Sequence, residues 1–160
     1  MTRHYAIASI LIGTLLILAC AANQSNTPAT MSQDTLVTPK LFNQVTGREW
    51  RLTEMTLNKK AINLVADSQT TFACDAGGRV SGIATLNRYS GNLKLQPDGE
   101  IIWSKAFIMT RMAGPPELMQ QEADFTQALM KTSRMYLNGP GLTLRSQDGS
   151  TTLAFEPAKK

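Results

Sequence analysis

Four carboxylates offer side chains for acid–base chemistry or for binding a cation: Asp75, Asp98, Glu100 and Asp148. Most of them lie in or beside turn sequences, where aspartate is favoured because it hydrogen-bonds the local backbone. The spacing matches no Asp-x-Asp-x-Asp-Gly calcium loop, and no Ser-x-x-Lys pair supplies an activated nucleophile. The glycines form no phosphate loop followed by Lys-Ser or Lys-Thr. The sequence therefore predicts a protein that is not an enzyme and needs no metal or cofactor.

The N-terminal residues have the pattern of an export signal. Arg3 precedes an apolar run from residue 6 to residue 18, which is shorter than the roughly 20 residues that span a bilayer. The run ends in Ile17-Leu18-Ala19-Cys20, which resembles the bacterial lipobox. The resemblance implies that residues 1–19 are a signal peptide and that Cys20 becomes the acylated N-terminus. The alternatives are an uncleaved anchor and an ordinary secreted protein with a chance cysteine.

The expected acylation predicts where the protein resides. Several acyl chains anchor a protein stably, since each buried methylene contributes about 0.8 kcal/mol. Ala21 and Ala22 follow the cysteine, whereas lipoproteins kept in the inner membrane resemble one another in carrying Asp there. We therefore expect a lipid-anchored protein of the cell envelope, on the periplasmic face of the outer membrane.

Cleavage before Cys20 also restricts the chemistry of the mature chain. It removes His4, the single histidine, and so excludes histidine-based triads, metal sites and proton relays. Cys74 is then the one free thiol, and no intramolecular disulfide can form. We interpret Cys74 as a buried small apolar residue, with a reactive thiol as the alternative.

The charge is modest and dispersed. Sixteen Lys and Arg residues against 12 Asp and Glu residues give a net charge of +4, with no long run of one sign. A nucleic-acid partner requires a concentrated basic face. The pattern therefore predicts an ordinary solvated surface and no nucleic-acid binding.

Residues 20–40 are predicted to form the acylated N-terminus and a flexible tether, because they are polar and lack apolar periodicity. The alternative is an N-terminal strand at Leu36-Val37. Residues 41–157 show short alternating runs separated by turn sequences, and residues 158–160 form a tail. This pattern predicts an α+β, mostly β domain: an antiparallel meander of about eight strands curled into a partly open barrel, with one packed helix.

The helix is predicted from Pro115-Pro116-Glu117 to about Lys131. Leu118, Phe125 and Leu129 form its apolar stripe, and Glu122 lies within that stripe. A carboxylate in this position is costly unless it is paired. We predict a structural pair with Arg111, just before the helix. The alternative is that Glu122 reaches solvent at the edge of the stripe.

Several motifs together resemble the META domain family, which includes the HslJ-like lipoproteins (DUF306). They are Arg79-Val80-Ser81-Gly82, Asn87-Arg88-Tyr89-Ser90-Gly91, and Thr110-Arg111-Met112-Ala113 followed by the Glu122 helix. The resemblance spans residues 45–157 and implies a cracked β-barrel, no established enzymatic activity and a link to envelope stress. The barrel is similar to that of the lipid-binding pilotin lipoproteins.

The chain departs from the family pattern at two positions. Leu86 and Gly114 stand where many members have cysteines, and both cysteines are missing together, as expected if they pair with each other. Asn87, Arg88 and Tyr89 belong to the family turn. They form a recognition surface or they shape a tight turn.

Two functions are consistent with these features. The first is an interaction or stress-tolerance module that binds an unidentified envelope protein. The second is a pilotin-like binder or chaperone of a lipid or other hydrophobic ligand. Its apolar lining would be a group of pliable methionines near the helix. The alternative is that these methionines only fill the core. They are Met109, Met112, Met119, Met130 and Met135.

Overall fold

The structure is a computed structural model that describes residues 34–159. The predicted signal peptide, the lipidation at Cys20 and most of the predicted tether lie outside the described residues. No helix within residues 34–159 combines the length and the apolar character needed to cross a membrane.

The described part consists of an 11-stranded antiparallel sheet, one α-helix and one short 3-10 helix. The N-terminal half contains β1 (Thr35–Leu36), η1 (Phe42–Gln44), β2 (Glu49–Leu57), β3 (Lys60–Ile62), β4 (Thr71–Cys74), β5 (Arg79–Ala84) and β6 (Asn87–Leu95). The C-terminal half contains β7 (Ile101–Trp103), β8 (Ile108–Met109), α1 (Pro116–Lys131), β9 (Arg134–Asn138), β10 (Gly141–Arg145) and β11 (Thr152–Pro157).

The sheet curls without closing. Its strands follow the order β1-β9-β10-β11-β2-β4-β5-β6-β7, with β3 paired to β2 and β8 paired to β6. Near the two ends of this path, the backbone N–H of Ile101 donates to the carbonyl of Ser133 at 2.7 Å, beside an isolated bridge between Glu100 and Arg134. The mostly β, cracked-barrel prediction is confirmed.

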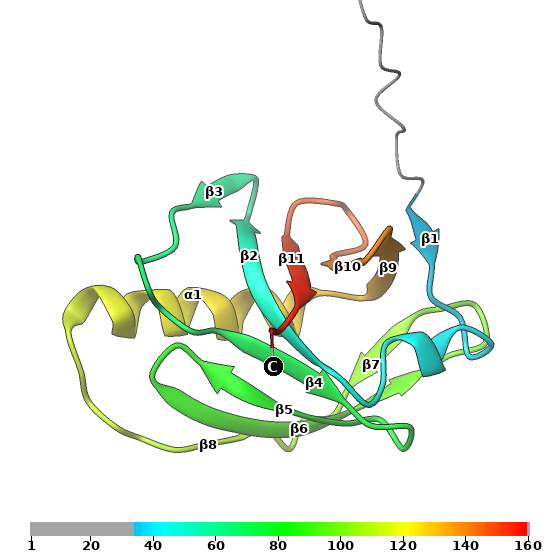
Figure 1. The fold of residues 1–160 in the computed structure, drawn as a ribbon, viewed down its shortest axis with the longest axis horizontal. Helices are drawn as coiled ribbons and strands as arrows, with labels where there is room; N and C mark the ends of the chain where they lie inside the picture. The colour runs from blue at the N-terminus through cyan, green and yellow to red at the C-terminus, as the bar shows by residue number, and fades with distance from the viewer. Residues whose placement is uncertain (1–33, 160) are drawn as a thin grey trace, which may run out of the picture. The chain divides into compact units, whose positions relative to one another are not determined.

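Alternating residues build the core on the concave side of the sheet. On β2, Trp50 and Leu52 are buried and Arg51 is exposed, as the period of two predicts. A register shift against β11 then moves the buried positions to Met55 and Leu57. The helix α1 runs behind β2 and β11 (Figure 1) and contacts both strands. It begins at Pro116 and ends at Lys131, and Phe125 and Leu129 are fully buried, as predicted.

The N-terminal boundary of the domain was predicted too late in the chain. Leu36 pairs with Tyr136 in β9, and the N–H of Val37 donates to the carbonyl of Met135 at 2.8 Å. Val37 is fully buried. The sheet therefore begins before residue 41, and the N-terminal strand, considered as the alternative to a tether, is present. At the other end Ala158, assigned to the tail, donates its N–H to the carbonyl of Glu49.

Candidate functional site

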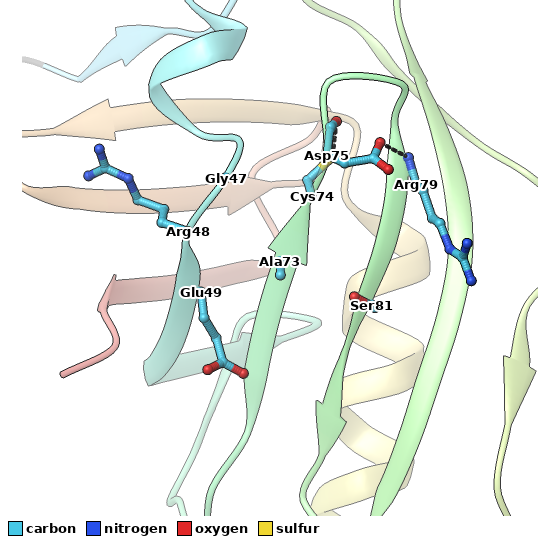
Figure 2. A pocket seen from close by; sticks show the side chains of 8 residues that line it. All are labelled: Gly47, Arg48, Glu49, Ala73, Cys74, Asp75, Arg79 and Ser81. Atoms are coloured by element: carbon cyan, nitrogen blue, oxygen red, sulfur yellow. Dashed lines mark hydrogen bonds between the residues drawn. The ribbon is translucent and has the colours of Figure 1, made fainter. Parts of the chain in front are cut away.

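A shallow hollow of about 290 Å³ lies where β2, β4 and β5 run side by side (Figure 2). It is lined by Gly47, Arg48, Glu49, Ala73, Cys74, Asp75, Arg79 and Ser81. Glu49, Ala73 and Ser81 occupy matching register positions on the three strands. The hollow is thus a candidate site, and its chemistry depends on Asp75 and Cys74.

Neither of these residues is free to react. Asp75 Oδ1 accepts hydrogen bonds from the N–H groups of Gly77 and Arg79, both at 2.9 Å, and so shapes the turn between β4 and β5. Figure 2 shows the Arg79 guanidinium directed away from that carboxylate. Burial, assisted by the negative charge of Asp75, raises the pKa of the Cys74 thiol to about 12. The Cys74 thiol is therefore protonated at neutral pH, in agreement with its interpretation as a buried apolar residue.

Asp98 and Asp148, two of the other candidate carboxylates, also serve turns, and the third, Glu100, is exposed. Asp98 Oδ1 accepts the N–H of Glu100 at 3.0 Å. Asp148 accepts the Ser146 hydroxyl at 2.6 Å and the Ser150 N–H at 3.0 Å, and these bonds lower its pKa to about 2. Within residues 34–159, no three His, Cys, Asp or Glu side chains are grouped to hold a metal ion.

A second, more apolar hollow lies between β8 and the first half of α1. We call it the methionine groove. Met112 and Met119 are 57% and 46% exposed, which is unusual for such large apolar side chains. The groove measures about 460 Å³ and is lined by Asn87, Met109, Thr110, Arg111, Met112, Ala113, Met119 and Glu122.

The structure groups three of the five predicted lining methionines and separates the other two. Met109, Met112 and Met119 line the groove. Met135 is fully buried in the core, because the alternation of β9 turns it inward, so its assignment to a ligand lining is wrong. Met130 is partly exposed on α1 and does not line the groove.

Glu122 has its polar partners on the β5–β6 turn. Its Oε2 accepts the N–H groups of Leu86 at 3.1 Å and Asn87 at 2.7 Å, and its Oε1 accepts Asn87 Nδ2 at 2.8 Å. Arg111 is not paired with Glu122 in the described part, where the ion pairs are Arg51–Glu156, Arg134–Asp98 and Arg145–Asp34. The expected Arg111–Glu122 pair is corrected accordingly: three N–H donors, rather than a guanidinium, stabilise the carboxylate.

Asn87 uses its whole amide group to join three segments. Besides donating to Glu122, Nδ2 donates to the carbonyl of Met112 at 3.1 Å. Oδ1 accepts the N–H of Met112 at 2.7 Å and the Thr110 hydroxyl at 2.8 Å. We call Asn87, Thr110 and Glu122 the clamp, since they tie the β5–β6 turn, the segment after β8 and α1 together.

Gln121 was not predicted to matter, yet it is a buried polar residue of α1. Its Oε1 accepts the N–H of Val65 at 2.6 Å, and its Nε2 donates to the hydroxyls of Ser68 and Thr85. It therefore holds the loop after β3 and the β5–β6 turn against the helix. A signal was present in the sequence, because Gln121 flanks the apolar stripe on the side opposite Glu122.

Two of the three candidate residues of the family turn have a structural role. Asn87 belongs to the clamp, and Tyr89 is buried, donating its hydroxyl to the carbonyl of Thr71 at 2.8 Å. The Tyr89 ring stacks on Phe107 with centroids 5.3 Å apart. Arg88 alone is exposed.

The two positions without the family cysteines are neighbours in space. A Cβ atom added to Gly114 would lie 2.7 Å from Leu86 Cδ1. Leu86 therefore packs into the space beside the glycine, next to the clamp.

Comparisons with known proteins extend this description. The family model described as META domain matches residues 43–159, and no curated protein matches the chain. A protein from Burkholderia xenovorans solved by NMR is 21% identical, with a TM-score of 0.64 over 80% of this chain and 92% of that one. A second NMR structure is 26% identical (TM-score 0.53; 75% and 94% covered). A DUF4847 family protein from Bacteroides vulgatus is 10% identical (TM-score 0.54; 75% and 99% covered).

Proposed function

The chain belongs to the META domain family, and on that premise we propose that it is a lipid-anchored envelope protein whose non-catalytic domain binds another envelope protein. The methionine groove is the proposed contact surface. Its occupant is an apolar protein segment that carries a carboxylate.

The proposal rests on one observation: most polar groups that line the groove are already hydrogen-bonded within the domain, whereas its methionine side chains are exposed. The amide of Asn87 and the carboxylate of Glu122 are already occupied by the clamp. The Thr110 hydroxyl donates to Asn87 and accepts the N–H of Arg88. These groups are therefore poor partners for a ligand, and what the groove presents is thioether surface from Met112 and Met119, which adapts to varied apolar shapes.

Arg111 supplies the one cationic group of the groove lining, and within residues 34–159 it forms no ion pair. Its guanidinium can bind a carboxylate in a bidentate manner. An apolar segment with an acidic residue complements this surface in both polarity and charge.

The shape of the domain favours a protein segment over a lipid held inside the barrel. The side chains between sheet and helix are close to fully buried and occupy the interior: Trp50, Phe72, Phe125, Leu129, Met135, Leu142, Leu144 and Leu153. A small hydrophobic ligand binds best in a cavity that covers most of its surface. The groove is an open surface feature, which suits a segment that is itself part of a folded protein.

The envelope location rests on the sequence alone, through the lipobox-like segment that ends at Cys20. Cys20→Ser should leave the precursor uncleaved and abolish labelling with radioactive palmitate. A processed and still labelled product would contradict the anchor.

The groove is tested by placing a photoreactive amino acid at Met112 in living cells, with the same replacement at Met130 as the matched control. Both side chains are exposed methionines, and only the first lines the groove. We expect a discrete protein adduct from position 112 that disappears in Met119→Asp and weakens in Arg111→Glu. Equal adducts from both positions, or an adduct insensitive to Met119→Asp, would reject the groove as the contact surface.

A further inference from the structure

The outer face of β5, β6, β7 and β8 carries a concentration of positive charge. Val80, Tyr89 and Leu93 point into the core, so the alternation of the strands turns Arg79, Arg88 and Lys94 outward. Lys105, in the loop between β7 and β8, is also exposed. We call this surface the basic face.

No negative charge comes from the segments that build the basic face. Residues 79–97 and 101–116 contain five Lys and Arg residues, at positions 79, 88, 94, 105 and 111, and no Asp or Glu. None of the four cations of the basic face takes part in an ion pair of the described part. Acidic residues border these segments: Asp75 and Asp98 hold the turns at the strand ends, and Glu100 and Glu117 adjoin the second segment. Glu49 on β2 lines the same hollow as Arg79 without an ion pair to it.

Two isoleucines stand out on the same face. Ile108 is 69% exposed and Ile102 is 51% exposed. Ile102 lies directly across from Lys94 in the register of β6 and β7, and Ile108 lies across from Ser90 in the register of β6 and β8. Exposed apolar side chains among unpaired cations suit a surface that is anionic outside and apolar just beneath.

We propose that the basic face docks on an anionic lipid surface, with Ile102 and Ile108 entering the headgroup region. The cations contact phosphate groups, and the isoleucines contact the upper ends of the acyl chains. A shallow hollow of about 240 Å³ on the same face is lined by Arg79, Ser90 and Ile108, among others, so a cation and an exposed apolar side chain lie close together there. The surface exists without any anchor, and a lipid on Cys20 would only keep it near the headgroups.

The test uses the chain as the cell makes it, purified in detergent and reconstituted into vesicles. A fluorescent NBD group is attached at Ile108→Cys and, as the matched control, at Ala61→Cys. Ala61 is exposed on β3, which lies far from β8 in Figure 1. Vesicles contain either phosphatidylcholine alone or phosphatidylcholine with one third phosphatidylglycerol.

We expect the emission of the Ile108 probe to shift to the blue and to be quenched by brominated lipids in the anionic vesicles only. The shift should be lost in about 0.5 M salt, where charges are screened within a few ångströms, and in the variant Arg79→Gln/Arg88→Gln/Lys94→Gln. The Ala61 probe should stay in water throughout. A water-like Ile108 probe in anionic vesicles, or equal shifts in both vesicle types, overturns the proposal.

The same samples separate this proposal from the anchor. Flotation with neutral vesicles reports the acyl chains, whereas the position of the Ile108 emission in anionic vesicles reports the basic face. A protein that floats with neutral vesicles but keeps a water-like Ile108 probe in anionic ones has its anchor and lacks the docking.

Discussion

Replacing Glu122 by alanine should be among the most damaging single changes outside the apolar core. The substitution removes the acceptor for three N–H donors, two of them on the backbone at the start of β6. The Leu86 N–H keeps the carbonyl of Ala84 as an acceptor at 2.9 Å, so the two donors of Asn87 carry the loss. Each buried donor left without a partner costs about 1–3 kcal/mol. Glu122 is itself half-buried, so water replaces part of the loss. We expect the free energy of unfolding to fall by about 2–4 kcal/mol, read from the midpoint of urea unfolding.

Glu122→Gln tests the same hydrogen bonds with a smaller chemical change. The new amide oxygen can keep the bonds from Leu86 and Asn87 N–H, but its NH₂ group then faces Asn87 Nδ2, which is also a donor. Asn87 cannot turn its amide over, because Oδ1 already accepts from Met112 and Thr110. The expected loss is about 1–2 kcal/mol, smaller than for alanine.

The control is Glu54→Ala, an exposed carboxylate on β2, which should change stability by less than about 0.5 kcal/mol. A double-mutant cycle should give strong coupling between Asn87→Ala and Glu122→Ala, and almost none between Arg111→Ala and Glu122→Ala. The clamp is refuted if Glu122→Ala unfolds at the same urea concentration as the parent, or if Arg111 carries the coupling.

Three further predictions follow from the same contacts. Leu86→Cys/Gly114→Cys should form a disulfide, since the two positions touch, and should add about 3 kcal/mol when oxidised; equal urea midpoints with and without reductant would contradict it. Cys74, with its raised pKa of about 12, should react with Ellman's reagent at pH 8 only as fast as the domain unfolds, and immediate labelling of the folded protein would show a reactive thiol. The Ser146 hydroxyl and then the Ser150 N–H lower the pKa of Asp148. The contribution of Asp148 to stability is therefore complete above its ordinary pKa of about 3.8 and is lost as the pH falls toward 2. In Ser146→Ala, NMR titration should give a higher Asp148 pKa, and an unchanged value would show that the Ser146 hydroxyl does not cause the shift.

Local patterns predicted the elements of this fold well. The period of two identified the buried side of β2, and Pro116 marked the first residue of α1. Asp75 and Asp148 were predicted to serve turns because the reason is local, namely a side chain bonding to the backbone two residues away.

Long-range partners could not be predicted in the same way. Glu122 was expected to need a partner, but the period of a helix does not say which distant segment lies against it, so Arg111 was chosen for its nearness in sequence instead of Asn87. Met135 shows the same limit, because it was grouped with the helix methionines although the alternation of β9 already indicated the core. The cations of the basic face are dispersed along the chain and meet only through the register of β5 and β6.

The pairing of β2 with β11 has a consequence for the order of events during synthesis. Thr152 to Pro157 occupy a position beside β2, so the centre of the sheet needs the last residues of the chain before it can form. Contacts so distant in sequence form slowly, because a long loop must close first. The β2–β11 pair therefore cannot form until residues 152–157 are available. In the export route that we propose, such a delay would keep the polypeptide competent for translocation.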